Sequence, residues 1–306
     1  MNRSWQGFKK SYLWYSFKRS KIAIISFCVL VLMMSVSILA PVLAPYNPFD
    51  PANIDIINSE LPPFWTEEGS LEFFLGTDIQ GRDLLSTMIY GLRLSIIIGC
   101  GAVLLQALLG VMVGLIAGYM GGKIDALLMR IADIQLSFPY LMVAIFISAI
   151  FQVVFGIGRY EELAVPLLVV IIGLAEWPVY ARTVRASVMG EKSKEYVEAA
   201  RVIGLSRRLI MFRHVLPNTL TSVLVISTIQ VANAVMSEAA LSFLGLGMPV
   251  TKPSMGSLIR SGFEYVFSGS WWITLFPSVV LVILVLVINY LGDWLRDVLN
   301  PKLYKG

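Results

Sequence analysis

The chain has 306 residues, of which 57% are hydrophobic and only 14% charged, and its formal net charge is +4. Soluble domains carry about 25% charged residues, so this composition excludes an ordinary soluble protein. The positive charge does not indicate a nucleic acid partner, because the basic residues follow the apolar runs instead of forming one patch. We therefore expect an all-α polytopic membrane protein.

Apolar runs that are long enough to cross a bilayer recur along the chain. Four of them contain no Asp, Glu, Lys or Arg, and these are 22–49, 94–122, 134–158 and 265–292. Helices are favoured because about 20 apolar residues span a bilayer and lipid cannot satisfy open backbone groups. Two further runs are nearly free of charge. The chain is thus predicted to form six transmembrane helices, at about 22–44, 94–119, 134–155, 163–181, 219–246 and 273–292.

The first run follows a basic tail, residues 1–21, as the core of a signal peptide would. Pro45 stands where cleavage would occur and the run is long for a signal core, so we expect an uncleaved anchor. Basic residues also fill the loop after the fourth run, whereas the segment 45–92 carries eight acidic residues. Because positive residues stay in the cytoplasm, both termini are predicted to be cytoplasmic. Segment 45–92 is then periplasmic, and 297–306 is a cytoplasmic tail.

Small residues mark one face of the second predicted span. Gly110, Gly114 and Gly118 recur every four residues, and this spacing lets a second membrane helix approach closely. We read them as a packing seam. The two cysteines, Cys28 and Cys100, lack the spacing of a metal site or a disulfide framework and are expected to be packing residues.

One polar loop, residues 187–218, interrupts the apolar chain between the fourth and fifth predicted spans. Strong helix formers run from Glu195 to Ile203. Gly204 suits a helix end in the left-handed conformation, and Ser206 suits the cap of a second helix. Pro217 is expected to end that second helix just before the fifth span.

Within the first helix of this loop, Ala199 and Ala200 are predicted to form a docking face, because small side chains let a partner approach the backbone. Glu198 beside them offers a charge to a basic residue of that partner. A short helix held between two spans also acts as a lever, so a push on it moves both spans.

The same loop resembles the signature of ABC importer permeases, in which Glu-Ala-Ala is followed by Gly and later by Leu-Pro. The matching positions are Glu198, Ala199, Ala200, Gly204, Leu216 and Pro217. Four other stretches are similar to the C-type permease subunit of dipeptide and oligopeptide importers. These are "LAPYNPFDP" (43–51), "LGTDIQGRDLLSTMIYGLRLSI" (75–96), "SFLGLG" (242–247) and "GDWLRDVLNPK" (292–302).

This resemblance implies a type I ABC importer permease fold, with a core at 93–296, in a bacterial inner membrane. It implies a non-catalytic subunit that forms half of a pore with a homologous second permease. Two ATP-binding subunits would dock on the loop, and a periplasmic peptide-binding protein would deliver substrate. The sequence contains no phosphate-binding glycine loop. ATP and Mg²⁺ are therefore expected on the partners, and no cofactor or metal on this chain.

Several alternatives remain at the level of the sequence. The same permease type also imports nickel or glutathione. A self-standing ion-coupled secondary transporter would need charged groups at the membrane midplane and an internal repeat, and a membrane scaffold would not need the Gly204 bend. Asn233 and Glu238 are candidate pore-lining residues, because polar groups within spans are functional candidates. Glu176, beside Trp177 and Pro178, is left open between a structural and a functional role.

Overall fold

The computed structural model describes residues 12–50 and 53–299; residues 1–11 and 300–306 of the predicted tails lie outside the described residues. Within the described ranges the chain is helical and has no β-strand, only an isolated bridge between Thr77 and Asp83. Its helices are α2 (Tyr12–Arg19), α3 (Lys21–Ile38), α4 (Ala40–Leu43), η2 (Ile56–Asn58), α5 (Leu84–Met120), α6 (Gly122–Leu136), α7 (Tyr140–Phe155), α8 (Ile157–Glu162), α9 (Ala164–Glu191), α10 (Glu195–Val202), α11 (Arg207–Leu209), η3 (Ile210–Val215), α12 (Leu216–Phe243), α13 (Met255–Phe263), η4 (Val266–Ser268) and α14 (Trp272–Leu299).

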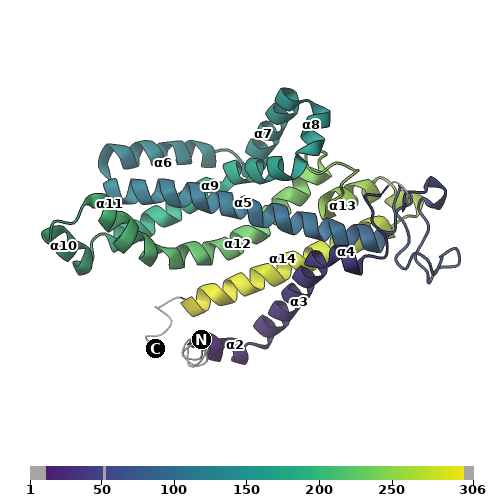
Figure 1. Cartoon of the computed structure of the whole chain (residues 1–306), viewed down its shortest axis with the longest axis horizontal. Helices are drawn as coiled ribbons and strands as arrows, with labels where there is room; N and C mark the ends of the chain where they lie inside the picture. The colour runs from purple at the N-terminus through teal and green to yellow at the C-terminus, as the bar shows by residue number, and fades with distance from the viewer. Residues whose placement is uncertain (1–11, 51–52, 300–306) are drawn as a thin grey trace.

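Five helical stretches are long and apolar enough to cross a membrane: α3, α5, α9, the continuous stretch Arg207–Phe243, and α14. A sixth is obtained if α6 and α7 are counted as one bent span. Figure 1 shows α5, α9 and α12 running side by side along the long axis of the molecule, with α14 and α3 on one flank. This arrangement agrees with the predicted all-α membrane fold.

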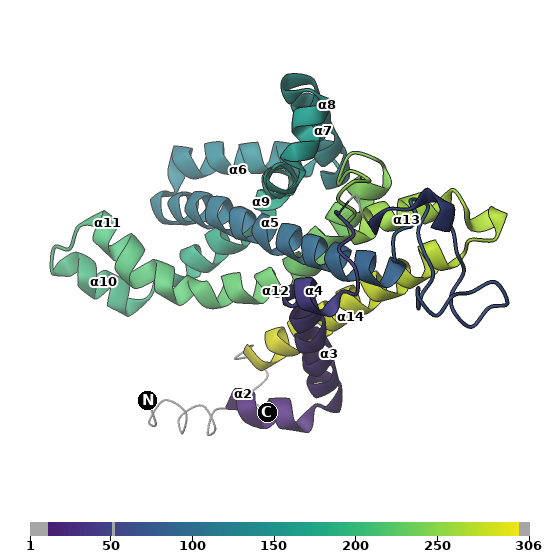
Figure 2. The same ribbon diagram turned by 45° about the vertical axis from the view of Figure 1, so that its right-hand side comes forward.

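The expected single helix at 134–155 is divided. α6 ends at Leu136, α7 begins at Tyr140, and the two helices meet at an angle of 89°. Pro139 stands at the break, where it lacks a backbone N–H and disfavours helical geometry in the residue before it. α6 therefore runs along the bundle, whereas α7 and α8 project from its side (Figures 1 and 2).

The second span starts ten residues before the expected position 94, because Asp83 caps α5 at Leu84. The Asp83 carboxylate accepts hydrogen bonds from the backbone N–H of Ser86 at 2.8 Å and from its hydroxyl at 2.5 Å. Burial raises the pKa of Asp83, and the bonds from Ser86 partly offset that rise. The cap fixes where the long helix begins after the segment 53–83.

The segment 53–83 has little regular structure and is held by a buried ion pair. Arg82 lies 2.6 Å from the carboxylate of Asp78, and both side chains are almost fully enclosed. Arg82 also donates to the backbone oxygen of Val250 at 3.0 Å, and Trp272 donates to that of Thr77 at 3.2 Å. The segment is thereby tied to the beginning of α14 and to the loop before α13.

The glycine seam on α5 is confirmed. A Cβ atom on Gly110 would lie 2.3 Å from the Cβ of Tyr180, and one on Gly114 would lie 2.4 Å from the backbone oxygen of Ala181. Gly118 meets the backbone of Arg185 in the same way, at 2.9 Å. Because no side chain fits, α5 and α9 pack backbone to backbone along the bundle.

The two described ends of the chain lie on the same side of the bundle. The rings of Phe17 in α2 and Trp294 in α14 contact each other, with centroids 5.3 Å apart. α10 and α11 lie toward that side of the long axis, and the segment 53–83 lies at the opposite end (Figure 1).

Candidate functional site

The loop between α9 and α12 forms the far end of the bundle. α10 and α11 reach past the adjoining ends of α5 and α6 in both views (Figures 1 and 2). α10 follows α9 after three residues, and α11 continues through η3 into α12. Short connections therefore join α10 to two long helices.

Gly204 ends the first helix of the loop in the predicted left-handed conformation, with φ at +84°. The N–H of Leu205 donates to the oxygen of Ala200 at 3.1 Å, and the N–H of Gly204 donates to that of Arg201 at 3.0 Å. These two bonds define a Schellman motif, which satisfies the last carbonyls of α10. A residue with a side chain would be strained at this φ.

The second helix of the loop does not end at Pro217, contrary to the expectation. Ser206 caps α11 through a bond from the N–H of Leu209 at 3.4 Å, and the helix then runs unbroken as Arg207–Phe243. The six residues of η3 are π-helical, and the N–H of Leu216 donates to the oxygen of Met211, five residues back. This wider turn accommodates Pro217, which cannot donate the usual bond and would crowd a tighter helix.

Ala199 and Ala200 do not share a face, so the expectation that both form the docking surface is wrong. Ala200 is only 5% exposed and packs in the core cluster that contains Val197 and Ile210. Ala199 is exposed together with Glu198. The small size of Ala200 thus seats α10 on η3, and Ala199 remains open at the surface.

The sequence reasoning missed the most exposed apolar residues of the loop. Val202 is 88% exposed and Ile203 is 76% exposed, at the end of α10. Together with Glu198 and Ala199 they form the surface that we call the α10 face. Two adjacent branched apolar residues in a polar loop were a signal that could have found it, because exposed apolar patches mark contacts.

Tyr196 ties α10 to both neighbouring long helices. Its hydroxyl donates to the carboxylate of Glu191 at the end of α9, at 2.7 Å, and accepts from the side chain of Asn218 in α12, at 3.0 Å. Asn218 also donates to the backbone oxygen of His214 at 2.7 Å. Burial and the bond to Glu191 raise the pKa of Tyr196, so the phenol remains a donor at neutral pH. We call these three side chains, Glu191, Tyr196 and Asn218, the Tyr196 clasp.

The two candidate pore-lining residues have different environments. Asn233 is exposed and donates to the side chain of Gln230 at 2.9 Å. Glu238 is fully buried, where Ser95 of α5 and Ser242 of α12 each donate to its carboxyl group at 2.7 Å. Glu238 therefore joins two helices and does not line an open surface of this chain, which differs from the expectation.

Glu176, which the sequence left open, is the centre of a second buried polar group. Ser237 donates to its carboxyl at 2.9 Å and Gln230 at 3.2 Å, while Gln106 of α5 lies at 3.4 Å. The group connects α5, α9 and α12 inside the bundle, with Asn233 at its exposed edge. Among residues 12–50 and 53–299, no cluster of three or more His, Cys, Asp or Glu is placed to hold a metal ion.

Solved structures show which fold the chain has. A chain of the inward-facing MetNI methionine ABC transporter superposes with a TM-score of 0.57 at 20% identity, over 70% of this chain and 97% of that one. A second crystal form of the same transporter gives a TM-score of 0.55 at 21% identity. At such identities the likeness shows the fold alone, which is that of a type I ABC importer permease.

The sequence then gives the family. Residues 110–305 match the binding-protein-dependent transport system inner membrane component, and residues 5–63 match the N-terminal TM domain of oligopeptide transport permease C. The chain belongs to this family of transport permeases. It is a multi-pass, non-catalytic membrane subunit of an ABC importer, as predicted, and the ion-coupled secondary transporter is not favoured.

Curated relatives match over nearly the whole length. The di/tripeptide transport system permease protein DppC of Pseudomonas aeruginosa is 37% identical over 95% of this chain and 91% of its own. The dipeptide transport system permease protein DppC of Escherichia coli K12 is 38% identical over 95% of this chain and 92% of its own. The predicted resemblance to C-type peptide permeases is therefore confirmed.

Proposed function

We propose that this chain is one of two homologous permeases in an importer for dipeptides and oligopeptides in a bacterial inner membrane. Its termini and the α10 face lie in the cytoplasm, and the segment 53–83 faces a periplasmic binding protein. Two partner subunits bind and hydrolyse ATP with Mg²⁺, and this chain binds no cofactor. The proposed coupling role rests on the exposed α10 face, which lies on a short helix between two long helices.

The substrate class rests on the names of the relatives, which transport di- and tripeptides. Its test is a binding screen of the cognate binding protein against dipeptides, tripeptides, longer peptides, glutathione and nickel complexes. We expect the short peptides to bind most tightly. Selective binding of nickel complexes or glutathione, with no peptide binding, would contradict the peptide assignment.

The proposed coupling path runs from the α10 face into the spans. An ATP-binding subunit docks on Glu198, Ala199, Val202 and Ile203 and shifts α10 when it binds ATP. Tyr196 passes that shift to α9 through Glu191 and to α12 through Asn218. Gly204 and the stretch Leu216–Pro217 keep the geometry of the loop, and Ala200 holds α10 against η3.

Docking on the α10 face predicts a loss of partner binding when a charge is placed there. Val202→Asp should reduce co-purification of the ATP-binding subunits. Docking removes water from this position, and removing water from a carboxylate costs free energy. Val202→Thr has a similar shape and is the matched control, which should retain most of the partner. Full retention of the partner by Val202→Asp, together with normal uptake, would remove Val202 from the interface.

The Tyr196 clasp predicts a coupling defect without loss of the fold. Tyr196→Phe removes the hydroxyl that two hydrogen bonds share, each with a net worth of about 1 kcal/mol. The two bonds together are worth about 2 kcal/mol, so the amount of peptide transported per ATP should fall by up to about thirty-fold, while basal ATP hydrolysis remains. Tyr290→Phe, at an exposed tyrosine of α14, is the control.

Asn218→Ala distinguishes a clasp from a local effect at Tyr196. If the two side chains act together, the double variant should lose no more coupling than either single variant. Additive losses, or unchanged transport per ATP in Tyr196→Phe, would exclude the clasp as the coupling path.

A further inference from the structure

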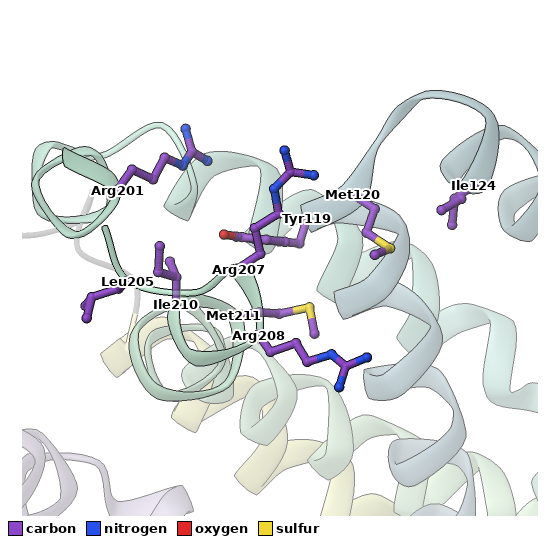
Figure 3. Close-up of a pocket in the computed structure, with 9 residues that line it drawn as sticks. All are labelled: Tyr119, Met120, Ile124, Arg201, Leu205, Arg207, Arg208, Ile210 and Met211. Atoms are coloured by element: carbon purple, nitrogen blue, oxygen red, sulfur yellow. The ribbon is translucent and has the colours of Figure 1, made fainter. Parts of the chain in front are cut away.

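A cavity lies between the α10–η3 segment and the junction of α5 with α6. Its volume is about 650 Å³. Its lining includes Arg201, Arg207 and Arg208 from the loop and Tyr119 and Ile124 from α5 and α6; Figure 3 shows the side chains of Arg207 and Arg208 pointing in different directions. The lining of the cavity thus combines three arginines with apolar residues.

Two of these arginines are not neutralised by the protein. Among the described residues, the ion pairs leave Arg207 and Arg208 without a carboxylate within 4.0 Å, and Arg201 has only Glu198, at 3.7 Å. Asp125 is the acidic residue in the first turn of α6, next to the cavity. It is already held by two bonds from Arg185, at 2.5 and 2.6 Å. The cavity therefore presents net positive charge.

The beginning of α6 adds to this positive character. Gly121 caps the helix without a side-chain hydrogen bond, so the first N–H groups of α6 are open near Ile124, which lines the cavity. Uncapped helix N-termini favour anions, and phosphate groups in particular. This feature agrees with the arginines and does not by itself define a site.

An exposed apolar stripe on α6 leads into the cavity. Ile124, Leu127, Ile131 and Ile134 are 44%, 64%, 49% and 56% exposed. Their spacing of three, four and three residues places them on one face of the helix. α6 is the first part of a candidate bent membrane span, and its beginning adjoins the cavity at Ile124.

From this juxtaposition we propose that the cavity binds one anionic phospholipid. Its phosphate lies in the cavity, to which Arg207 and Arg208 contribute positive charge, and its acyl chains lie along the α6 stripe. Basic pockets at the cytoplasmic edge of membrane helices recognise such headgroups, because arginine matches phosphate geometry. The bound lipid joins the loop that carries α10 to α6. The inference does not depend on the transported substrate, because lipid binding is measured directly.

The test measures lipid binding to the full-length chain, purified in detergent with the subunits that accompany it, by native mass spectrometry. Phosphatidylglycerol should bind, and phosphatidylethanolamine should bind much more weakly. Replacing both arginines, as Arg207→Gln with Arg208→Gln, should weaken phosphatidylglycerol binding by about thirty-fold, because each basic residue near the surface contributes about one factor of five. Arg213→Gln, an exposed arginine of the same loop that does not line the cavity, should bind the lipid as the unchanged protein does.

Further arms separate the lipid from other ligands. Leu127→Asp should reduce phosphatidylglycerol binding, and glycerol phosphate at the same concentration should not displace the lipid. Equal binding of the two phospholipids, or displacement by glycerol phosphate, would overturn the proposal. It would also be overturned if the double arginine variant kept its lipid but lost its ATP-binding subunits, since the cavity would then serve a protein partner.

Discussion

Gly204→Pro is expected to abolish ATP-driven uptake while the chain still inserts and keeps its partner permease. Proline fixes φ near −65°, whereas Gly204 has φ at +84° and donates the bond to Arg201 that closes α10. The variant therefore loses the Schellman motif and the direction in which α10 points. ATP hydrolysis should continue, but it should no longer increase with substrate-loaded binding protein. Parallel assays of hydrolysis and uptake in proteoliposomes measure this.

Gly204→Asn is the matched control, because asparagine tolerates the left-handed conformation better than other non-glycine residues. Nothing lies within 4 Å of a Cβ atom at this position, so the added side chain meets no neighbour. Uptake should remain within a few-fold of the unchanged protein. Normal coupling in the proline variant would show that the Gly204 bend plays no part in transmission.

Gly114→Leu is expected to prevent the spans from packing, with the largest loss of stability of any single change proposed for this chain. A Cβ atom there would lie 2.4 Å from the backbone oxygen of Ala181 and 2.9 Å from the Cβ of Val184. Overpacking costs about 1–3 kcal/mol where side chains can move, and here the nearest atom is backbone. The yield of folded protein in detergent and its unfolding temperature should both fall sharply.

Gly190→Leu is the control for that prediction. Gly190 lies in the last turn of α9 and has nothing within 4 Å of a Cβ atom. Leucine there should leave the unfolding temperature unchanged or raise it slightly, because it favours helix more than glycine does. Equal stability of Gly114→Leu and the unchanged protein would contradict the close approach of α5 and α9.

The sequence predicted those features of the fold that depend on neighbouring residues in the chain. Long apolar runs predicted the spans, and glycines at every fourth position predicted the α5–α9 seam. The division of the helix expected at 134–155 was missed, because the angle of 89° between α6 and α7 depends on what each helix packs against. The early start of α5 was missed, because its cap at Asp83 belongs to the folded segment 53–83.

The sequence predicted the position of the loop and the helix end at Gly204. It did not predict which residues of α10 are exposed and which are buried. Gly204 predicted the left-handed helix end, because few other residues adopt that conformation. The separation of Ala199 from Ala200 depends on how α10 packs against η3, and that packing is set only in the folded loop. The Tyr196 clasp joins residues 191, 196 and 218, which only the folded loop brings together.

We propose that ATP hydrolysis by partner subunits drives import through this chain, and that the resulting movement reaches the spans through α10. The most direct test of this proposal is the uptake of a labelled dipeptide into proteoliposomes that contain both permeases, the ATP-binding subunits and the binding protein. Uptake is expected only when ATP and all subunits are present, should be insensitive to an ionophore, and should be lost in Gly204→Pro. Uptake that persists without ATP and collapses with the ionophore would contradict the proposal.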